Sequence, residues 1–142
     1  MKYLLILMFG SVACWDAVTT YIGAMAILNS RSFAMPASII ITIATTAFAL
    51  STKYIFADPT TTGWKLPRGS GIIFIPLWLL AICFNIYTSF IANSQVLILN
   101  QEVIITDFQV LAMSMGQIEI WFALGITLLV SGSSLLVSLF LS

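Results

Sequence analysis

Hydrophobic residues run along this chain in four long stretches, separated by shorter segments that carry most of its charged and turn-forming residues. The stretches cover residues 3–28, 36–56, 71–93 and 117–141, with an apolar continuation of the third through 96–99. A helix needs about 20 residues to cross the hydrocarbon core of a bilayer. Only a helix satisfies every backbone polar group of a lone apolar segment internally. The pattern therefore predicts an all-α integral membrane protein with a bundle of four transmembrane helices.

The connection between the third and fourth stretches, residues 94–116, is unusually apolar for a loop. Its apolar residues are interrupted by Asp107 and Gln109, so it is too polar to span a bilayer. A short helix over 106–115, lying in the outer interface with Thr106 as its N-cap, explains this mixture. A loop folded over the bundle explains it equally well, and the pattern leaves both interpretations open.

The composition agrees with a chain surrounded by lipid. Hydrophobic residues make up 61% of the 142 and charged residues only 7%, and the mean hydropathy is +1.11. A soluble domain carries roughly 25% charged residues to keep its surface in water. We therefore expect one membrane domain over residues 1–142, with the lipid bilayer as its main partner. The formal net charge is zero and no basic cluster occurs, so nucleic acid is not an expected partner.

The distribution of Lys and Arg predicts how the helices are oriented. One side of the membrane would hold both termini and the connection 57–70, with four basic residues: Lys2, Lys53, Lys65 and Arg68. The other side would hold one basic and three acidic residues: Arg31, Glu102, Asp107 and Glu119. Basic residues are retained in the cytoplasm, so both termini are predicted to be cytoplasmic. We expect this membrane to be the plasma (inner) membrane of a prokaryote.

The first stretch has a competing interpretation as a secretory signal. Lys2 precedes an apolar run that reaches small residues and Cys14, as in a signal that ends at a lipidation site. The apolar run, however, continues to Leu28 without a break, whereas the apolar core of a signal is about 7–15 residues long. The length favours a retained transmembrane helix.

The first and third stretches share a pattern when the chain is shifted by 69 residues. Residues 14–23 (CWDAVTTYIG) then align with residues 83–92 (CFNIYTSFIA). The polar positions form three matched pairs: Asp16 with Asn85, Thr19 with Thr88, and Thr20 with Ser89. The match predicts two parallel two-helix repeats, related by a pseudo-twofold axis along the membrane normal. Chance similarity between two spans rich in small residues is the alternative.

Asp16 is the principal candidate for a functional residue. It lies about 20 Å along its helix from Lys2, near the bilayer midplane, and Asn85 reaches the same depth in the third span. An aspartate at that depth costs about 2.5–3.5 kcal/mol on insertion scales, so such residues face the bundle interior or a wet cavity. Hydroxyl residues at i+3 and i+4 share its helical face. The candidate ion- or substrate-binding residues are Asp16, Asn85, Thr19, Thr20, Thr88 and Ser89. As a set they fit a binding site and a structural clasp between helices equally well.

Nothing in the sequence favours an enzyme, a cofactor site or a metal site. The chain has no histidine, and Asp16 has no second titratable residue beside it for acid–base catalysis. Two cysteines cannot complete a zinc site alone. Cys14 and Cys83 would form a disulfide if the first and third spans pack side by side. Buried free thiols are the favoured interpretation.

Two further stripes of small and hydroxyl residues lie at helical spacing, and such residues let membrane helices approach closely. They are Thr42, Thr45 and Ala49 in the second span, and Ser131, Ser134 and Ser138 in the fourth. Both are predicted to be packing surfaces. Two functions remain. One is a small transporter or channel that moves a proton, a cation or a small solute. The other is a non-catalytic accessory or assembly subunit. The protein partner would be a second copy of this chain or another membrane protein.

Overall fold

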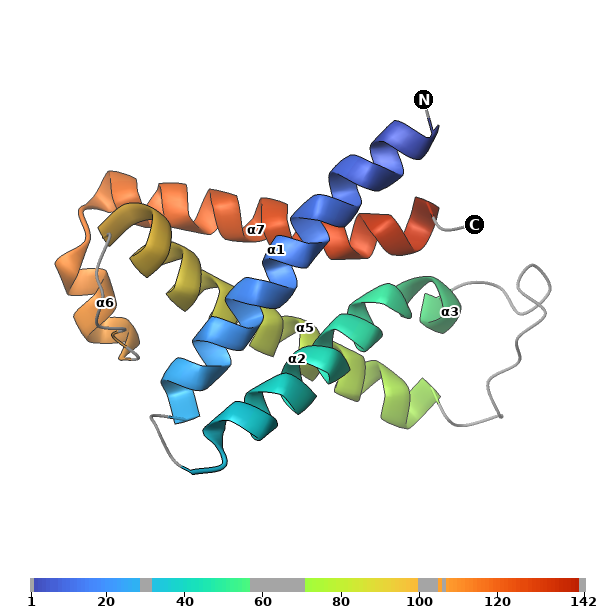
Figure 1. Cartoon of the computed structure of the whole chain (residues 1–142), viewed down its shortest axis with the longest axis horizontal. Coiled ribbons are helices and arrows are strands. Elements are labelled where there is room, and N and C mark those ends of the chain that lie inside the picture. Colours follow the sequence, from blue (N-terminus) through green and yellow to red (C-terminus); the bar gives the residue numbers. More distant parts are fainter. Residues whose placement is uncertain (1, 29–31, 57–70, 100–104, 106, 141–142) are drawn as a thin grey trace.

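The computed structural model describes residues 2–28, 32–56, 71–99, 105 and 107–140. Along the chain, the helices are α1 (Lys2–Leu28), α2 (Ala34–Leu50), α3 (Thr52–Phe56), α5 (Gly71–Asn93), the π-helix η1 (Ser94–Leu99), α6 (Phe108–Ser114) and α7 (Gln117–Phe140). Figure 1 shows their arrangement. No strand occurs within the described ranges, so the all-α prediction is confirmed there.

Three of these helical segments are long and apolar enough to cross a membrane: Tyr3–Leu28, Ile73–Leu97 and Gln117–Ser138. A fourth apolar helix, α2, has only 17 residues. At 1.5 Å per residue it is about 26 Å long, somewhat short of the ~30 Å of hydrocarbon. The length and apolarity of these helices indicate an integral membrane protein.

The second apolar stretch is not the single helix over 36–56 that its sequence predicts. It divides at Ser51 into α2 and α3. The hydroxyls of Ser51 and Thr52 donate to the carbonyl oxygens of Ala47 (2.7 Å) and Ala49 (2.6 Å), and such bonds compete with the regular helical pattern. Trp78 of α5 donates to the Thr52 hydroxyl at 3.0 Å. The break lies at hydroxyls that form additional hydrogen bonds, within the helix and with a neighbouring tryptophan.

The third stretch continues past α5 into η1, so the apolar continuation through 96–99 is helical. Within η1, the Gln95 side chain forms two hydrogen bonds of 2.7 Å to the backbone of Ile105, one to its carbonyl oxygen and one from its amide. Gln95 is 1% exposed. It therefore fixes the chain that leads into α6.

Of the two interpretations left open for the connection, the short helix is present, as α6 (Phe108–Ser114), but its N-cap is Asp107 and not Thr106. Asp107 Oδ1 accepts hydrogen bonds from the amides of Gln109 (2.8 Å) and Val110 (3.4 Å). The positive end of the helix dipole also stabilises a carboxylate at this position, which favours Asp107 as the N-cap. Thr106, the expected N-cap, lies outside the described residues. The position of α6 at a membrane interface stays a prediction.

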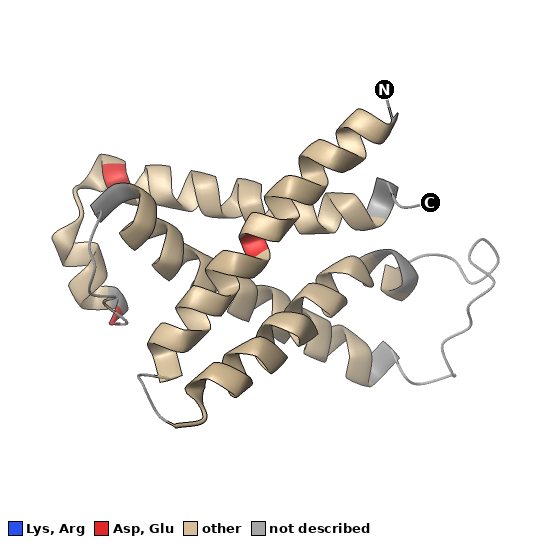
Figure 2. Ribbon diagram, in the orientation of Figure 1, with Lys and Arg blue, Asp and Glu red and all other residues tan. Residues whose placement is uncertain are grey.

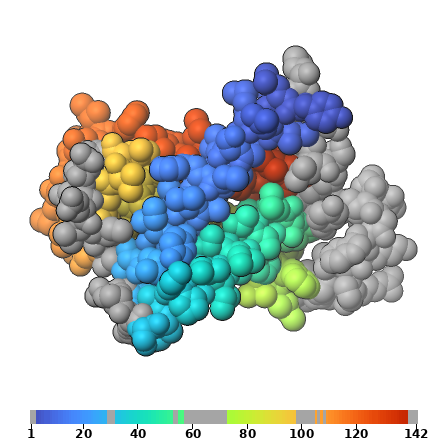
Figure 3. Space-filling model, viewed as in Figure 1, coloured from blue at the N-terminus to red at the C-terminus, as the bar shows by residue number. Residues whose placement is uncertain are grey.

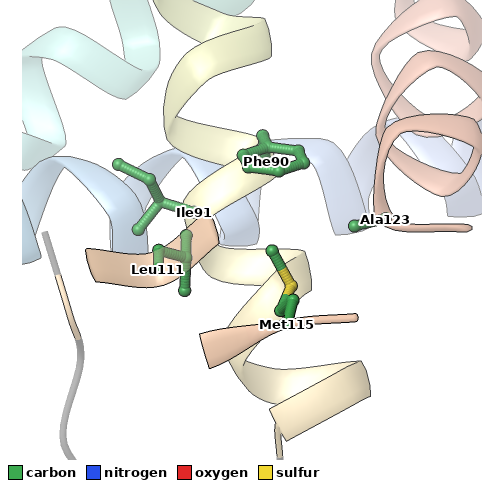
Figure 4. Close-up of a cluster of buried hydrophobic side chains, with 5 residues drawn as sticks. All are labelled: Phe90, Ile91, Leu111, Met115 and Ala123. Atoms are coloured by element: carbon green, nitrogen blue, oxygen red, sulfur yellow. The ribbon is translucent and has the colours of Figure 1, made fainter. Parts of the chain in front are cut away.

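A small apolar cluster holds α6 against the bundle. Its buried members are Phe90, Ile91, Leu111, Met115 and Ala123, which come from α5, α6, the turn after α6 and α7. Figure 4 shows Leu111 and Met115 lying close to the α5 side chains. Next along the chain, Glu119 accepts a hydrogen bond from the Gly116 amide at 2.8 Å and thereby caps the start of α7. The connection between α5 and α7 is thus packed on the bundle.

Each of the four long helices contacts the other three, and the contacts of α1 are the most extensive. Helices α1 and α5 run in one sense along the long axis, and α2 and α7 run in the other (Figure 1). On the face drawn in Figure 3, α1 lies against α2. Several of the charged residues that predict orientation lie outside the described residues: Arg31, Lys65, Arg68 and Glu102. The side chains of Lys2 and Lys53 are not described either. The orientation therefore stays a prediction.

The bundle has a polar interior and an apolar surface. Thr88, Asn93 and Thr127 are 0% exposed, whereas Leu80 and Leu129 are 67% and 69% exposed. Soluble domains show the opposite distribution. Since apolar side chains at the surface cost nothing in lipid, this distribution agrees with a chain embedded in a bilayer.

Candidate functional site

The carboxylate of Asp16 lies near the midpoint of α1 and is 4% exposed. Figure 2 shows an acidic residue in this position, and the other acidic residues that the structure describes lie near α6 and the start of α7. Asp16 Oδ1 accepts hydrogen bonds from the hydroxyls of Ser89 (3.1 Å) and Ser131 (2.9 Å). Asp16 Oδ2 accepts hydrogen bonds from the side-chain amide of Asn85 (2.9 Å) and from the hydroxyl of Ser134 (2.7 Å). An ionised carboxylate offers about four acceptor positions, so these donors occupy all of them.

Two neighbouring helices supply the four donors. Asn85 and Ser89 are four residues apart on α5, and Ser131 and Ser134 are three apart on α7. Both spacings place a pair of side chains on one face of a helix. One carboxylate of α1 is thereby bonded to both α5 and α7. We call Asp16, Asn85, Ser89, Ser131 and Ser134, together with Thr19 and Thr20, the Asp16 cluster.

Thr19 and Thr20 form the second layer of this cluster. Their hydroxyls lie 3.0 and 2.8 Å from the backbone carbonyl oxygen of Asp16. Thr19 also lies 3.0 Å from the Ser89 hydroxyl, and Thr20 is hydrogen-bonded to Asn85 Oδ1. Because each hydroxyl carries one proton, these contacts are alternatives among which the donors can switch.

Thr88 is the candidate that does not join the cluster through a hydrogen bond described in the structure. Its hydroxyl bonds to the carbonyl oxygens of Phe84 (2.9 Å) and Asn85 (3.0 Å) on its own helix. Its backbone instead lies at a close approach of α5 to α1. A Cβ placed on Gly23 would lie 2.3 Å from the Thr88 carbonyl oxygen. Thr88 is therefore a packing position, and glycine at 23 permits the contact.

Sequence reasoning assigned Ser131 and Ser134 to packing, but both donate to Asp16. The sequence does contain a pattern that is typical of such a contact, namely two serines three residues apart in one span and an acid in another. The stripe of α2 does behave as a packing surface. Thr42 and Thr45 bond to carbonyl oxygens of their own helix, and Ala49 is 1% exposed.

A second polar contact lies two helical turns beyond Asn85, and nothing in the sequence pointed to it. The side-chain oxygen Oδ1 of Asn93 accepts a hydrogen bond from the Trp15 indole at 3.2 Å, and Nδ2 of Asn93 donates to the Thr127 hydroxyl at 3.4 Å. These contacts again join α1, α5 and α7. The buried hydroxyls of Ser38 and Ser94 have no hydrogen-bond partner among the described residues.

All the hydrogen-bond partners of the Asp16 carboxylate in the described ranges are electrically neutral. The described part of the chain contains no group of three or more His, Cys, Asp or Glu side chains suited to a metal ion. Cys14 and Cys83 are free there and exposed. The disulfide alternative is therefore wrong. The thiols are free as favoured but not buried, because both lie on the outer surface of their helices.

Comparison of the chain with protein-family models, with curated proteins and with solved structures finds no match. Function must therefore be argued from the chemistry of the Asp16 cluster.

Proposed function

We propose that this is a small polytopic membrane protein that moves a proton, a cation or a small solute across the bilayer past Asp16 and Asn85. The observation that carries the proposal is a carboxylate 4% exposed, near the midpoint of an apolar helix, with neutral partners on two other helices. A charged group at that depth is costly and in membrane proteins commonly marks an ion or substrate pathway.

Packing alone does not require an acid at this position. The stripe of α2 consists of two threonines and an alanine, and the threonine hydroxyls bond to carbonyl oxygens of their own helix. Such small residues suffice for close helix contact in lipid. An aspartate adds a group that can accept a proton or balance a positive charge. This chemistry supports transport over simple packing.

We propose four spans, with α2 and α3 together forming the second. Their combined range, 34–56, is long enough to cross ~30 Å of hydrocarbon despite the break at Ser51. Both termini would lie in the cytoplasm of a prokaryotic cell. The opposite directions of successive long helices support this topology (Figure 1).

We also propose that α1–α2 and α5–α7 are parallel repeats. Two of the matched pairs are in contact: Asp16 with Asn85 at 2.9 Å, and Thr20 with Ser89 at 3.4 Å. Residues related by a twofold axis meet each other only where they lie close to that axis. These contacts support a pseudo-twofold axis between α1 and α5.

The transport proposal is tested by flux into proteoliposomes, with an imposed gradient and dyes sensitive to protons, sodium or potassium. The Asp16→Asn variant is expected to lose flux because its side chain cannot carry the negative charge. Asp107→Asn is the matched control, since it makes the same chemical change at an exposed N-cap, where asparagine also caps well. Equal flux from the wild type and Asp16→Asn would overturn the proposal.

A second candidate function is a non-catalytic accessory or assembly subunit, acting with a second copy or with another membrane protein. The observation that favours it is the full set of donors on the carboxylate, which lets Asp16 act as a clasp between α1, α5 and α7. Under this alternative, Asp16→Asn would weaken assembly in mild detergent without changing any flux. A monomer that purifies alone and shows Asp16-dependent flux would exclude it.

A further inference from the structure

We infer that the Asp16 cluster binds a single dehydrated monovalent metal ion of about the size of sodium. This inference rests on the proposed transport function and narrows its substrate class. The ligands would be the Asp16 carboxylate, the hydroxyl oxygens of Ser89, Ser131 and Ser134, and the carbonyl oxygen of Asn85.

The charge of the cluster bears on the valence of the ion. Asp16 provides a single negative charge, and its described hydrogen-bond partners are all neutral. A buried unbalanced charge in a medium of low dielectric constant is strongly unfavourable. One monovalent cation makes the occupied cluster neutral, whereas a divalent cation leaves it with a charge of +1. The charge of the cluster therefore favours a monovalent ion.

The type of ligand atom bears on the class of metal ion. Every group that bonds to the Asp16 carboxylate can also offer an oxygen: three are hydroxyls and the fourth is an amide with a carbonyl oxygen. Carboxylate, carbonyl and hydroxyl oxygens suit hard metal ions, whereas thiolate and imidazole suit transition metals. The chain has no histidine, and both cysteines are on the outer surface.

The cluster can change from donors to ligands without moving a helix. Each serine hydroxyl has two lone pairs besides its proton, so rotation about its C–O bond turns a lone pair toward the carboxylate. The Asn85 amide now donates from Nδ2 to Asp16 and accepts at Oδ1 from Thr20. Turning this amide over places Oδ1 beside Asp16, and Thr20 then donates to the backbone carbonyl of Asp16 that it already contacts.

The packing of the cluster bears on the size of the ion. The backbones of α1 and α5 meet at Gly23 and Thr88, so closely that one added methyl group would overlap the Thr88 carbonyl. All members of the Asp16 cluster are at most 6% exposed. Seating one atom among these side chains requires only the side chains to move apart, whereas an organic ion or a polyatomic solute would require the helices to separate. The packing therefore favours a bare ion.

The test uses the purified full chain in detergent, with thermal unfolding followed by tryptophan fluorescence at constant pH and ionic strength. Sodium chloride is compared with N-methylglucamine chloride, potassium chloride and magnesium chloride. A ligand at ten times its dissociation constant should raise the unfolding midpoint by about 3–6 °C for a chain of this size. We expect this saturable increase with sodium, a smaller one with the larger potassium ion, and none with N-methylglucamine or magnesium.

Two variants and one control assign the effect to the cluster. Asp16→Asn and the double variant Ser131→Ala/Ser134→Ala should lose the sodium-dependent increase. Ser138→Ala should keep it, because that hydroxyl lies on the same face of α7 but bonds to the Leu135 carbonyl. If Asp16→Asn does not fold, the serine double variant carries the test alone.

The outcomes separate this inference from the proposed function. Identical midpoints in sodium and N-methylglucamine overturn the inference, and Asp16-dependent proton flux in that case leaves the transport proposal standing. An equal effect of magnesium, or a sodium effect that persists in the serine double variant, also overturns it. Sodium stabilisation that depends on the cluster, without any sodium flux, supports the site and contradicts transport.

Discussion

The Asn85 amide donates a 2.9 Å hydrogen bond to Asp16 Oδ2, and the two residues are 69 positions apart. That interval is the one at which residues 14–23 align with 83–92. The bond therefore joins equivalent positions of the two proposed repeats. Asp16 is an acid, and Asn85 is its uncharged near-isostere, so the cluster carries a single charge. Two aspartates in these positions would repel each other.

Removal of either α7 hydroxyl should destabilise the bundle. Ser131→Ala and Ser134→Ala each delete one donor to the buried Asp16 carboxylate and leave an acceptor position unfilled. Hydrogen bonds inside membrane proteins average about 0.6 kcal/mol, and bonds to charged groups are stronger. We expect a loss of about 1–2 kcal/mol for each variant, measured by unfolding in mixed micelles. Ser138→Ala should cost less, and an equal cost would contradict a special role for the other two.

Gly23 should tolerate no larger residue. In Gly23→Ala the new methyl group would lie 2.3 Å from the Thr88 carbonyl oxygen, so α1 and α5 must separate. Overpacking of this kind costs about 1–3 kcal/mol. Gly10→Ala is the matched control on the same helix, because nothing lies within 4 Å of its added Cβ. We expect Gly10→Ala to be neutral or slightly stabilising. Similar unfolding free energies for the two variants would show that the contact is not tight.

The helices themselves could be predicted from sequence because bilayer thickness and apolar length determine them. Helices α1 and α7 follow the predicted ranges 3–28 and 117–141 closely. The break at Ser51 was not predicted. Beside it, Thr52 accepts a hydrogen bond from Trp78, a residue 26 positions away. The length of an apolar stretch contains no information about such a contact between helices.

The candidate site was predicted only in part. The pairing of Asp16 with Asn85 at one depth was inferred from the alignment of the two segments, and the structure adds that their side chains are hydrogen-bonded. Ser131 and Ser134 were assigned to packing because a hydroxyl in a membrane helix serves packing and hydrogen bonding equally well. Only the rotation of α7 about its axis decides between these uses, and the sequence does not state which neighbour each face of α7 meets.

Gln95 should control the attachment of α6. Its side chain satisfies both backbone groups of Ile105, and Gln95→Ala would leave them without those partners. We expect faster hydrogen exchange at the Ile105 amide and through α6, measured by mass spectrometry on the protein in detergent. Gln109→Ala is the control, because Gln109 is exposed on α6 itself. Unchanged exchange in Gln95→Ala would show that the apolar cluster holds α6 without this clamp.

Exchanging the two central residues tests whether they are equivalent. Asp16→Asn removes the charge, and the added change Asn85→Asp restores one carboxylate at the partner position. Asn85 already lies 3.4 Å from Ser131 and is bonded to Thr20, so an aspartate there has donors within reach. We therefore expect the double variant to recover part of the stability and of any flux that Asp16→Asn loses. Unfolding in mixed micelles and proteoliposome flux measure the two effects. A double variant no better than Asp16→Asn in both assays would show that the carboxylate works only from α1, and would count against two equivalent repeats.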